Sequence, residues 1–189
     1  GIDVQYVAEQ FENDGSPVST IVKGVKRAMA GEYSRELSGK VFAGQCRLIE
    51  LGFRQGGPAG YGLRRVLVDQ HGHHKAELAR GEHKSLQTDR VILMPGPEHE
   101  IATVLQMFRW LLEEDASFGD IANRLNAQGI RTDFDRAWTY STVRQVLTNE
   151  KYIGNNVYNR QSFKLKKLHV KNPPGMWIRK EGAFEGIVP

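Results

Sequence analysis

The sequence has a single cysteine, Cys46, so the chain cannot form an internal disulfide. It also lacks any uncharged apolar run that approaches the roughly 18 residues needed for a membrane-spanning helix. No basic and apolar leader stands at its beginning. These absences argue against a secreted or membrane-embedded protein. They predict a protein of the reducing cytoplasm that has no membrane partner.

Motifs for metal ions and nucleotides are absent as well. Histidines occur in a polar stretch, at His71, His73, His74 and His83, without the Cys-x-x-Cys or His-Glu-x-x-His spacing of zinc sites. The glycine-rich stretch 56–62 lacks the Gly-Lys-Ser/Thr ending of a phosphate-binding loop. We therefore predict no metal site and no other cofactor.

The net charge of +4 is spread unevenly along the chain. Residues 21–65 contain nine bases and three acids, residues 95–115 one base and five acids, and residues 116–189 twelve bases and six acids. Two basic blocks separated by neutral and acidic stretches are typical of a protein that binds a polyanion across two surfaces. Charge alone is equally compatible with ordinary solvated surfaces.

The first half of the chain predicts one strand and one long helix. Residues 2–7 alternate apolar and polar side chains like a half-buried strand, but no partner strand follows nearby, which favours a piece of a larger domain. Ser16 and Pro17 are start signals for a helix and Gly52 is a stop signal. Between them apolar residues recur at helical spacing in one stripe. We predict a helix over 17–52, about 50 Å long, that needs a protein or nucleic-acid partner.

The middle of the chain predicts a hinge and a pair of strands. The turn-rich stretch 55–62 breaks all periodicity and is the predicted hinge. Residues 61–69 and 85–94 are strand-like. We expect them to form a hairpin-like pair joined by a long, mobile loop.

Three helices are expected in residues 95–149. The first opens at Gly96-Pro97-Glu98, the second is capped by Ser117 and ended by Gly129, and the third is capped by Thr139. A strand at 157–158 and a lysine-rich segment with Lys171 follow. This order is typical of winged-helix proteins. The predicted fold class is therefore α+β and mainly helical, with a long protruding helix before a winged-helix-like DNA-binding domain that has small β elements.

The third helix has a predicted inward face and a predicted outward face. The inward face consists of Tyr140, Val143, Val146 and Leu147. The outward face consists of Ser141, Thr142, Arg144, Gln145 and Thr148. Arg144 and Gln145 are side chains that can make paired hydrogen bonds to guanine and adenine edges. Ser141 and Thr142 can donate to phosphate, so this face predicts a DNA contact.

Four segments resemble the large serine site-specific recombinases of the resolvase/invertase superfamily. Residues 24–41, GVKRAMAGEYSRELSGKV, resemble the long helix that closes the catalytic domain. Residues 57–65, GPAGYGLRR, resemble the entry to the recombinase domain. Residues 138–154, WTYSTVRQVLTNEKYIG, are similar to its Trp...Ser-Thr-Val...Leu-x-Asn-x-x-Tyr-Ile-Gly signature, and residues 173–178, PPGMWI, to its closing segment.

The resemblance implies DNA strand exchange through a phosphoserine link in a tetramer, at a double-stranded attachment site, in a protein of bacterial or phage origin. It makes residues 1–16 the last strand and loop of a truncated catalytic domain, 17–52 a helix for self-association, and 53–189 the DNA-binding domain. The nucleophilic serine is expected upstream of residue 1, so the chain alone should be inactive. Glu32 and Arg35 match the Glu-x-x-Arg that borders the family's active site. A zinc module, where present, would begin beyond residue 189.

The candidate DNA-contacting residues are cations of the two basic blocks and polar residues of the third helix. They are Lys26, Arg27, Arg35, Lys40, Arg47, Arg54, Arg64, Arg65, Arg136, Tyr140, Ser141, Thr142, Arg144, Gln145, Lys151, Arg160, Lys164, Lys166 and Lys167. An alternative is a non-enzymatic winged-helix DNA-binding regulator that dimerises through the long helix. It explains the charge and the third helix equally well. A structural interaction module would leave the basic segments unexplained.

Overall fold

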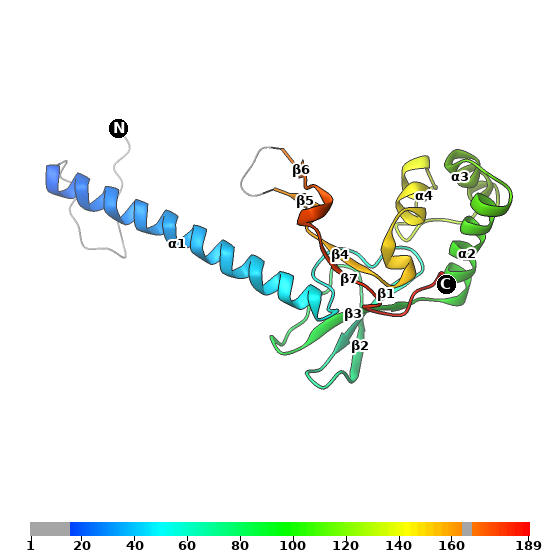
Figure 1. Cartoon of the computed structure of the whole chain (residues 1–189), viewed down its shortest axis with the longest axis horizontal. Coiled ribbons are helices and arrows are strands. Elements are labelled where there is room, and N and C mark those ends of the chain that lie inside the picture. Colours follow the sequence, from blue (N-terminus) through cyan, green and yellow to red (C-terminus); the bar gives the residue numbers. More distant parts are fainter. Residues whose placement is uncertain (1–15, 164–167) are drawn as a thin grey trace. The chain divides into compact units, whose positions relative to one another are not determined.

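The structure of the protein is a computed structural model that describes residues 16–163 and 168–189. In these ranges the fold is α+β, as predicted, with α-helices and short antiparallel strands (Figure 1). The chain divides into two compact units, Gly1–Gly44 and Gln45–Pro189. No helix of the described part is both long and apolar enough to cross a membrane. The strand expected at residues 2–7 lies outside the described residues.

The predicted long helix is present as α1, Pro17–Glu50. Ser16 caps its first turn, because its side-chain oxygen accepts a backbone hydrogen bond three residues later at 3.2 Å. The helix ends in a Schellman motif, in which the amide of Phe53 donates to the carbonyl of Leu48 at 2.9 Å. Gly52 supplies the required left-handed residue, with φ at +92°. The start and stop signals in the sequence therefore predict both ends of the helix.

The apolar residues of α1 do not form one straight stripe, so that expectation was wrong. After Val25 they recur every four residues, at Met29, Tyr33, Leu37 and Val41. Four residues turn an α-helix about 40° beyond one full turn, so the row winds around the helix. These five side chains are 47–67% exposed. The helix therefore offers a winding row of apolar side chains instead of a single apolar face.

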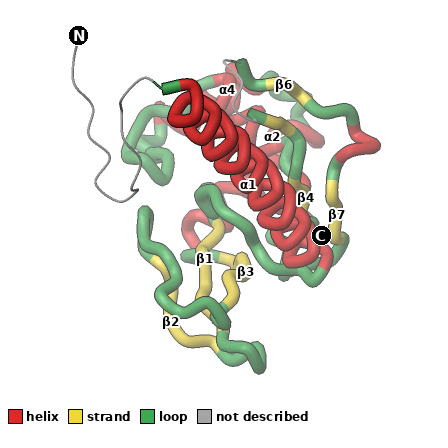
Figure 2. The backbone as a smooth tube through the Cα atoms, turned by 90° about the vertical axis from the view of Figure 1, so that its left-hand side faces the viewer, coloured by secondary structure: helices red, strands yellow, loops and turns green. Residues whose placement is uncertain are grey.

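A three-stranded antiparallel sheet follows, with the order β2-β1-β3 (Figure 2). The expected pair is present as β1, Leu63–Val68, and β3, Arg90–Pro95. The link between them is more than the predicted loop, since β2, His74–Leu78, pairs with the other edge of β1. Only the last residue of β2 is buried, so backbone hydrogen bonds hold this strand without an apolar pattern in its sequence.

The three predicted helices are α2, Glu98–Glu113, α3, Phe118–Ala127, and α4, Tyr140–Leu147. Each of the three contacts the other two. The start of α3 has the expected capping box, in which Ser117 and Asp120 each accept a hydrogen bond from the other's backbone amide. Local capping and the apolar spacing therefore predict this helical layer.

Short elements complete the second unit. They are η1, Glu150–Ile153, β4, Asn156–Tyr158, β5, Gln161–Ser162, β6, Val170–Lys171, η2, Pro174–Met176, and β7, Ile178–Lys180. Strand β4 pairs with β7, and β5 pairs with β6. The chain then returns to η1, where the carbonyl of Tyr152 accepts hydrogen bonds from Ile187 at 2.8 Å and from Val188 at 2.9 Å.

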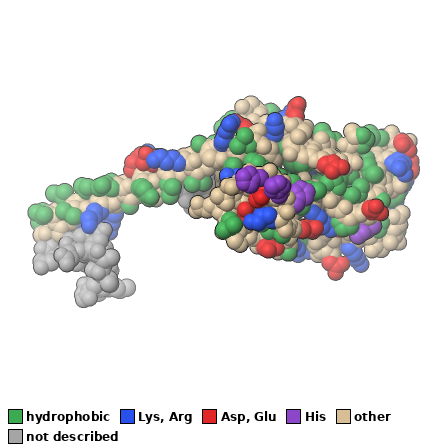
Figure 3. All heavy atoms as spheres, turned by 90° about the horizontal axis from the view of Figure 1, so that it is seen from below, with side chains coloured by type: hydrophobic (Ala, Val, Ile, Leu, Met, Phe, Trp, Pro, Cys, Tyr) green, Lys and Arg blue, Asp and Glu red, His purple; other side chains and the backbone are tan. Residues whose placement is uncertain are grey.

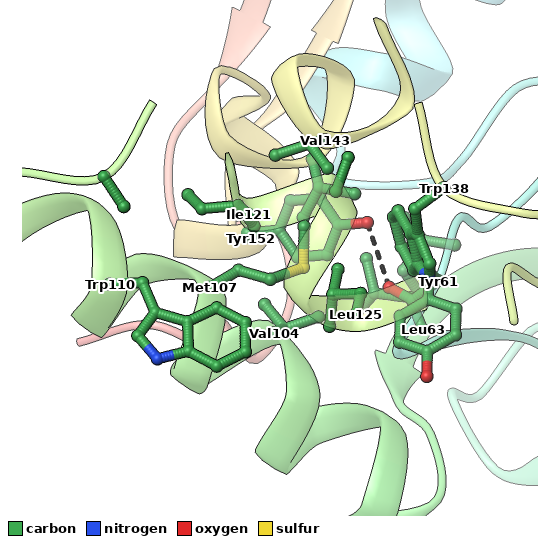
Figure 4. Packing of buried hydrophobic residues seen from close by; sticks show 14 residues of the cluster. Tyr61, Leu63, Val104, Met107, Trp110, Ile121, Leu125, Trp138, Val143 and Tyr152 are labelled. Carbon is green, nitrogen blue, oxygen red and sulfur yellow. Dashed lines mark hydrogen bonds between the residues drawn. The ribbon is translucent and has the colours of Figure 1, made fainter. Parts of the chain in front are cut away.

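The core of the second unit lies between the helical layer, the start of β1 and η1 (Figure 4). The rings of Tyr61 and Trp138 meet edge to face, with centroids 5.0 Å apart. Tyr152 is 1% exposed, and its hydroxyl donates to the carbonyl of Tyr61 at 2.9 Å. This bond joins η1 to the turn that precedes β1.

Replacing Tyr152 by Phe should destabilise the protein, because the buried carbonyl of Tyr61 would lose its donor. The expected loss in the free energy of unfolding is about 1–3 kcal/mol. Tyr140→Phe is the matched control, since the ring of Tyr140 is 57% exposed. Urea unfolding of both variants measures the difference. Equal stability of the two variants would contradict the role of this hydrogen bond.

Candidate nucleic-acid interface

Helix α4 has one buried face and one open face. Val143 and Val146 are 0% and 6% exposed, and Leu147 packs against the core. Tyr140 is 57% exposed, so its assignment to the inward face was wrong. It occupies the first helical position, where its ring packs against Phe118 with centroids 5.5 Å apart.

The beginning of α4 is fixed by side chains on both sides of the cap. Thr139 Oγ1 accepts from the amide of Thr142 at 3.3 Å, and Thr142 Oγ1 accepts from the amide of Thr139 at 2.8 Å. Asn126 of α3 exchanges two hydrogen bonds with the backbone of Trp138, at 2.8 and 2.9 Å. The hydroxyl of Thr142, which we expected to bind phosphate, is therefore committed to the cap.

A groove of about 710 Å³ borders the open face of α4. Residues of α4 and the turn after it form one part of its lining, and Arg160, the β5–β6 hairpin and the segment after it form the other; Figure 1 labels α4, β5 and β6. The lining residues are Ser141, Arg144, Gln145, Thr148, Asn149, Arg160, Gln161, Lys171, Asn172 and Trp177. Three of them are cations and none is acidic, so the groove suits an anionic ligand.

Three polar side chains of α4 are available to such a ligand. Within the described part of the chain, the side chains of Ser141, Arg144 and Gln145 make no hydrogen bond and no ion pair. All three are exposed. A guanidinium brings five donors, a carboxamide brings donors and an acceptor, and a hydroxyl brings one of each. The set can therefore recognise both charge and a pattern of donors and acceptors.

A second set of side chains holds the other part of the groove. The guanidinium carbon of Arg160 lies 4.9 Å from the ring centroid of Trp177. The indole nitrogen of Trp177 donates to the carbonyl of Asn172 at 2.9 Å, and Asn172 Nδ2 donates to the carbonyl of Asn159 at 2.7 Å. This chain of contacts fixes the base of the hairpin that carries Lys171.

The side chains of three candidate cations point toward the interior of the protein. Arg64 binds the carboxylate of Glu100 through both terminal nitrogens, at 2.9 and 2.6 Å. The ammonium of Lys151 donates to the carbonyl of Ala59 at 2.5 Å. Burial, with the nearby charge of Arg54, lowers the pKa of Lys151 to about 8. Burial also lowers the pKa of Arg54 itself. None of these three side chains lines the α4 groove.

Four candidate cations of α1 precede Gln45 and none of them lines the groove. Lys26, Arg27, Arg35 and Lys40 belong to the first unit and are exposed. Arg35 pairs with Glu32 at 3.4 Å, the two residues of the Glu-x-x-Arg match.

The remaining candidates fall in three places. Arg47 pairs with Glu50 at 3.4 Å near the end of α1. Arg65 donates to a carbonyl at the end of β2, and Arg136 is exposed in the loop before α4. The lysines at 164, 166 and 167 lie outside the described residues.

The candidate set missed several residues of the groove. Lys171, Gln161 and Trp177 line it but were not among the candidates. Lys171 belongs to the lysine-rich segment and Trp177 to the segment that resembles the family's closing motif, so the sequence held a signal for both. Their approach to α4 depends on the β5–β6 hairpin and the segment after it, which sequence spacing does not predict.

The exposed histidines of the β1–β2 turn have a local role. The carboxylate of Asp69 accepts from the amides of His73 and His71 at 2.9 and 2.8 Å and from the ring of His73 at 3.1 Å. These bonds lower the pKa of Asp69 to about 2, and the bond from the His73 amide contributes most. Histidine side chains gather on the face seen in Figure 3. Within residues 16–163 and 168–189, no three His, Cys, Asp or Glu side chains are grouped as ligands for a metal ion.

Comparison with known proteins gives one match. The model of the family described as Recombinase matches residues 98–189, a range that begins with α2 and includes α4 and the whole groove. The comparisons with curated proteins and with solved structures gave no match.

The buried ammonium of Lys151 makes the stability of the protein depend on pH. Its pKa is about 8 in the folded state, below the ordinary value of 10.5, so the unfolded chain binds more protons between these values. The free energy of unfolding should therefore rise from pH 8 to pH 10.5, by up to about 3 kcal/mol. We expect the stability of the wild type relative to Lys151→Met to increase over this range in chemical unfolding. A constant difference would show that the ammonium is solvated.

Proposed function

Because residues 98–189 carry a domain of the Recombinase family, we propose that this chain is the DNA-binding portion of a serine site-specific recombinase. A domain of this kind implies an interaction with DNA. The family match favours this proposal over a non-enzymatic regulator, which would use α4 in a similar way.

The observation that carries the proposal is the open face of α4. Arg144 and Gln145 point away from the buried Val143 and Val146, and both line a groove without acids. An α-helix fits into the major groove of duplex DNA, where the donor and acceptor pattern differs for each base pair. We assign Arg144 and Gln145 to base edges, the former to guanine and the latter to adenine.

The other polar groups of the groove are assigned to phosphates. Ser141 lies in the first turn of α4, where the backbone amides also attract anions. Lys171 carries a point charge, which suits a phosphate oxygen better than a base edge. Arg160 is stacked on Trp177 and can donate to phosphate from a fixed plane. These contacts would set the position of the duplex without selecting its sequence.

The remaining parts of the proposal rest on the resemblance to large serine recombinases. Helix α1 would associate with other subunits in a dimer and in a synaptic tetramer, and it would pass beside the minor groove. Glu32 and Arg35 would border the active site. No residue of this chain is assigned as the nucleophile that forms the phosphoserine link.

Arg144→Ala tests the assignment to base edges. On a duplex selected by the wild-type chain from a random pool, the variant should lose about 1–3 kcal/mol of binding free energy. On random duplexes the loss should be much smaller, because phosphate contacts remain. Fluorescence anisotropy measures both affinities, and circular dichroism checks the fold. An equal loss on both kinds of duplex would show that α4 does not select the sequence.

Lys171→Ala tests the assignment to phosphate. It should weaken binding to selected and random duplexes by similar factors, and it should lower the slope of log K against log salt by about one. Arg109→Ala is the control, since Arg109 is an exposed cation of α2 that does not line the groove. Wild-type affinity that stays the same between roughly 50 and 200 mM salt would contradict DNA binding altogether.

A further inference from the structure

A second hollow lies beside the three-stranded sheet and shares no residue with the α4 groove. Its volume is about 180 Å³. The lining residues are Arg54, Gln55, Gly56, Gly57, Arg65, Leu78, Glu82, His83, Lys84, Asp89, Arg90 and Val91. All of them precede residue 98, so the hollow lies outside the matched family domain.

Three cations of the hollow donate hydrogen bonds to backbone carbonyls, and one of them, Arg90, also lies over the ring of Phe53, with its guanidinium carbon 5.9 Å from the ring centroid. The carbonyl of Gln87 accepts from Lys84 at 3.0 Å and from Arg90 at 2.7 Å. Arg65 donates to the carbonyl of Glu82 at 3.1 Å. In the described part of the chain, none of these cations pairs with a carboxylate. The carbonyl groups orient these cations, but because they carry no net charge they do not neutralise them.

Arg54 adds an enclosed charge to the same place. Its Nη1 donates to Asn156 Oδ1 at 3.3 Å, and its buried Nε has no hydrogen-bond partner among the described residues. No carboxylate pairs with it there either. An enclosed guanidinium without a counter-charge is costly. An anion in the hollow would remove that cost.

The two acids that line the hollow are already occupied. The carboxylate of Asp89 is buried and accepts from Lys75 Nζ at 2.8 Å. Glu82 Oε2 accepts from the amide of Ala79 at 2.8 Å. Four Arg and Lys side chains against two acids leave the lining with a net charge of +2, before Lys75 is included. This excess of positive charge is complementary to the negative charge of a phosphate group.

The size of the hollow narrows the class of ligand. Sites for drug-sized molecules have volumes of about 300–1,000 Å³, so a hollow of 180 Å³ fits a phosphate group better than a whole nucleoside. Gly56 and Gly57 form one side, with φ at +65° and +74°. A side chain at Gly57 would begin 3.3 Å from Arg54 Nη2, so glycine leaves the guanidinium open.

We infer that this hollow binds a phosphate group of the DNA backbone, as a second anchor for the duplex besides the α4 groove. The inference rests on the proposed DNA-binding function and extends it to a part of the chain that the family match does not cover. The anchor contributes affinity and positions the duplex, and it does not select bases.

Lys84→Gln and Arg54→Gln test the anchor, with Arg109→Gln as the control that removes one exposed charge from α2. Affinities for selected and random duplexes are measured in full-length chains at several salt concentrations. Each hollow variant should lower the salt slope by about one, so the change in Kd between 50 and 200 mM salt shrinks about 3- to 4-fold on both duplexes. Lys84 is exposed, so Lys84→Gln keeps the test open if Arg54→Gln fails to fold.

Unchanged slopes in the folded hollow variants, with the wild type still binding DNA, would overturn the anchor. Titration with inorganic phosphate, followed at the amides of Gly56 and Gly57 by NMR, separates the sources of phosphate. Shifts of these amides with unchanged DNA slopes would assign the hollow to free phosphate and overturn the DNA contact. A wild-type chain that binds no duplex would overturn both proposals, and phosphate shifts would then describe an independent anion site.

Discussion

The structure of the second unit depends on the hydrogen bonds that hold one short segment, residues 59–64, against the helical layer and η1. Glu100 of α2 accepts from the amide of Gly62 at 2.9 Å and holds the guanidinium of Arg64 at 2.6 and 2.9 Å. Lys151 and Tyr152 of η1 donate to the carbonyls of Ala59 and Tyr61. Because this segment leads directly into β1, the central strand, these bonds join the sheet to the helices. The glycine-rich stretch expected to be a hinge therefore lies inside one compact unit, and its second half is held in place.

Local signals in the sequence account for most of the helical architecture. Ser16, Ser117 and Thr139 cap the helices they were expected to cap, and the glycines that follow two of these helices end them. Strand β2 was missed because its first four residues are exposed and show no alternation. It exists because the backbone of β1 accepts it as a partner, which is a property of the assembled sheet.

The candidate site could be predicted only in part. The helical period places Arg144 and Gln145 outside the face formed by Val143, Val146 and Leu147, so the open face of α4 followed from the sequence. The helical period of α4 says nothing about the surroundings of cations elsewhere in the chain. Lys151 was a candidate for DNA contact, but its ammonium is enclosed and donates to the carbonyl of Ala59. The contribution of Lys171 depends on the β5–β6 hairpin and on the contacts of Trp177. Such contacts leave no periodic pattern in the sequence, and only the folded chain reveals them.

Two backbone segments approach closely near η1, at Gly154 and Gly186. The fold constrains these positions differently from the exposed positions of α4. A Cβ at Gly154 would lie 2.5 Å from the carbonyl oxygen of Phe184, and one at Gly186 would lie 2.9 Å from the carbonyl carbon of Ile153. Any descendant of this sequence that keeps the fold must therefore keep glycine at both positions, whatever DNA it binds. The side chains at 144 and 145 are exposed and make no hydrogen bond or ion pair with the described residues. Under the proposed function, selection for a new DNA target can exchange these two side chains, so the same framework can diversify in specificity while its two glycines stay unchanged.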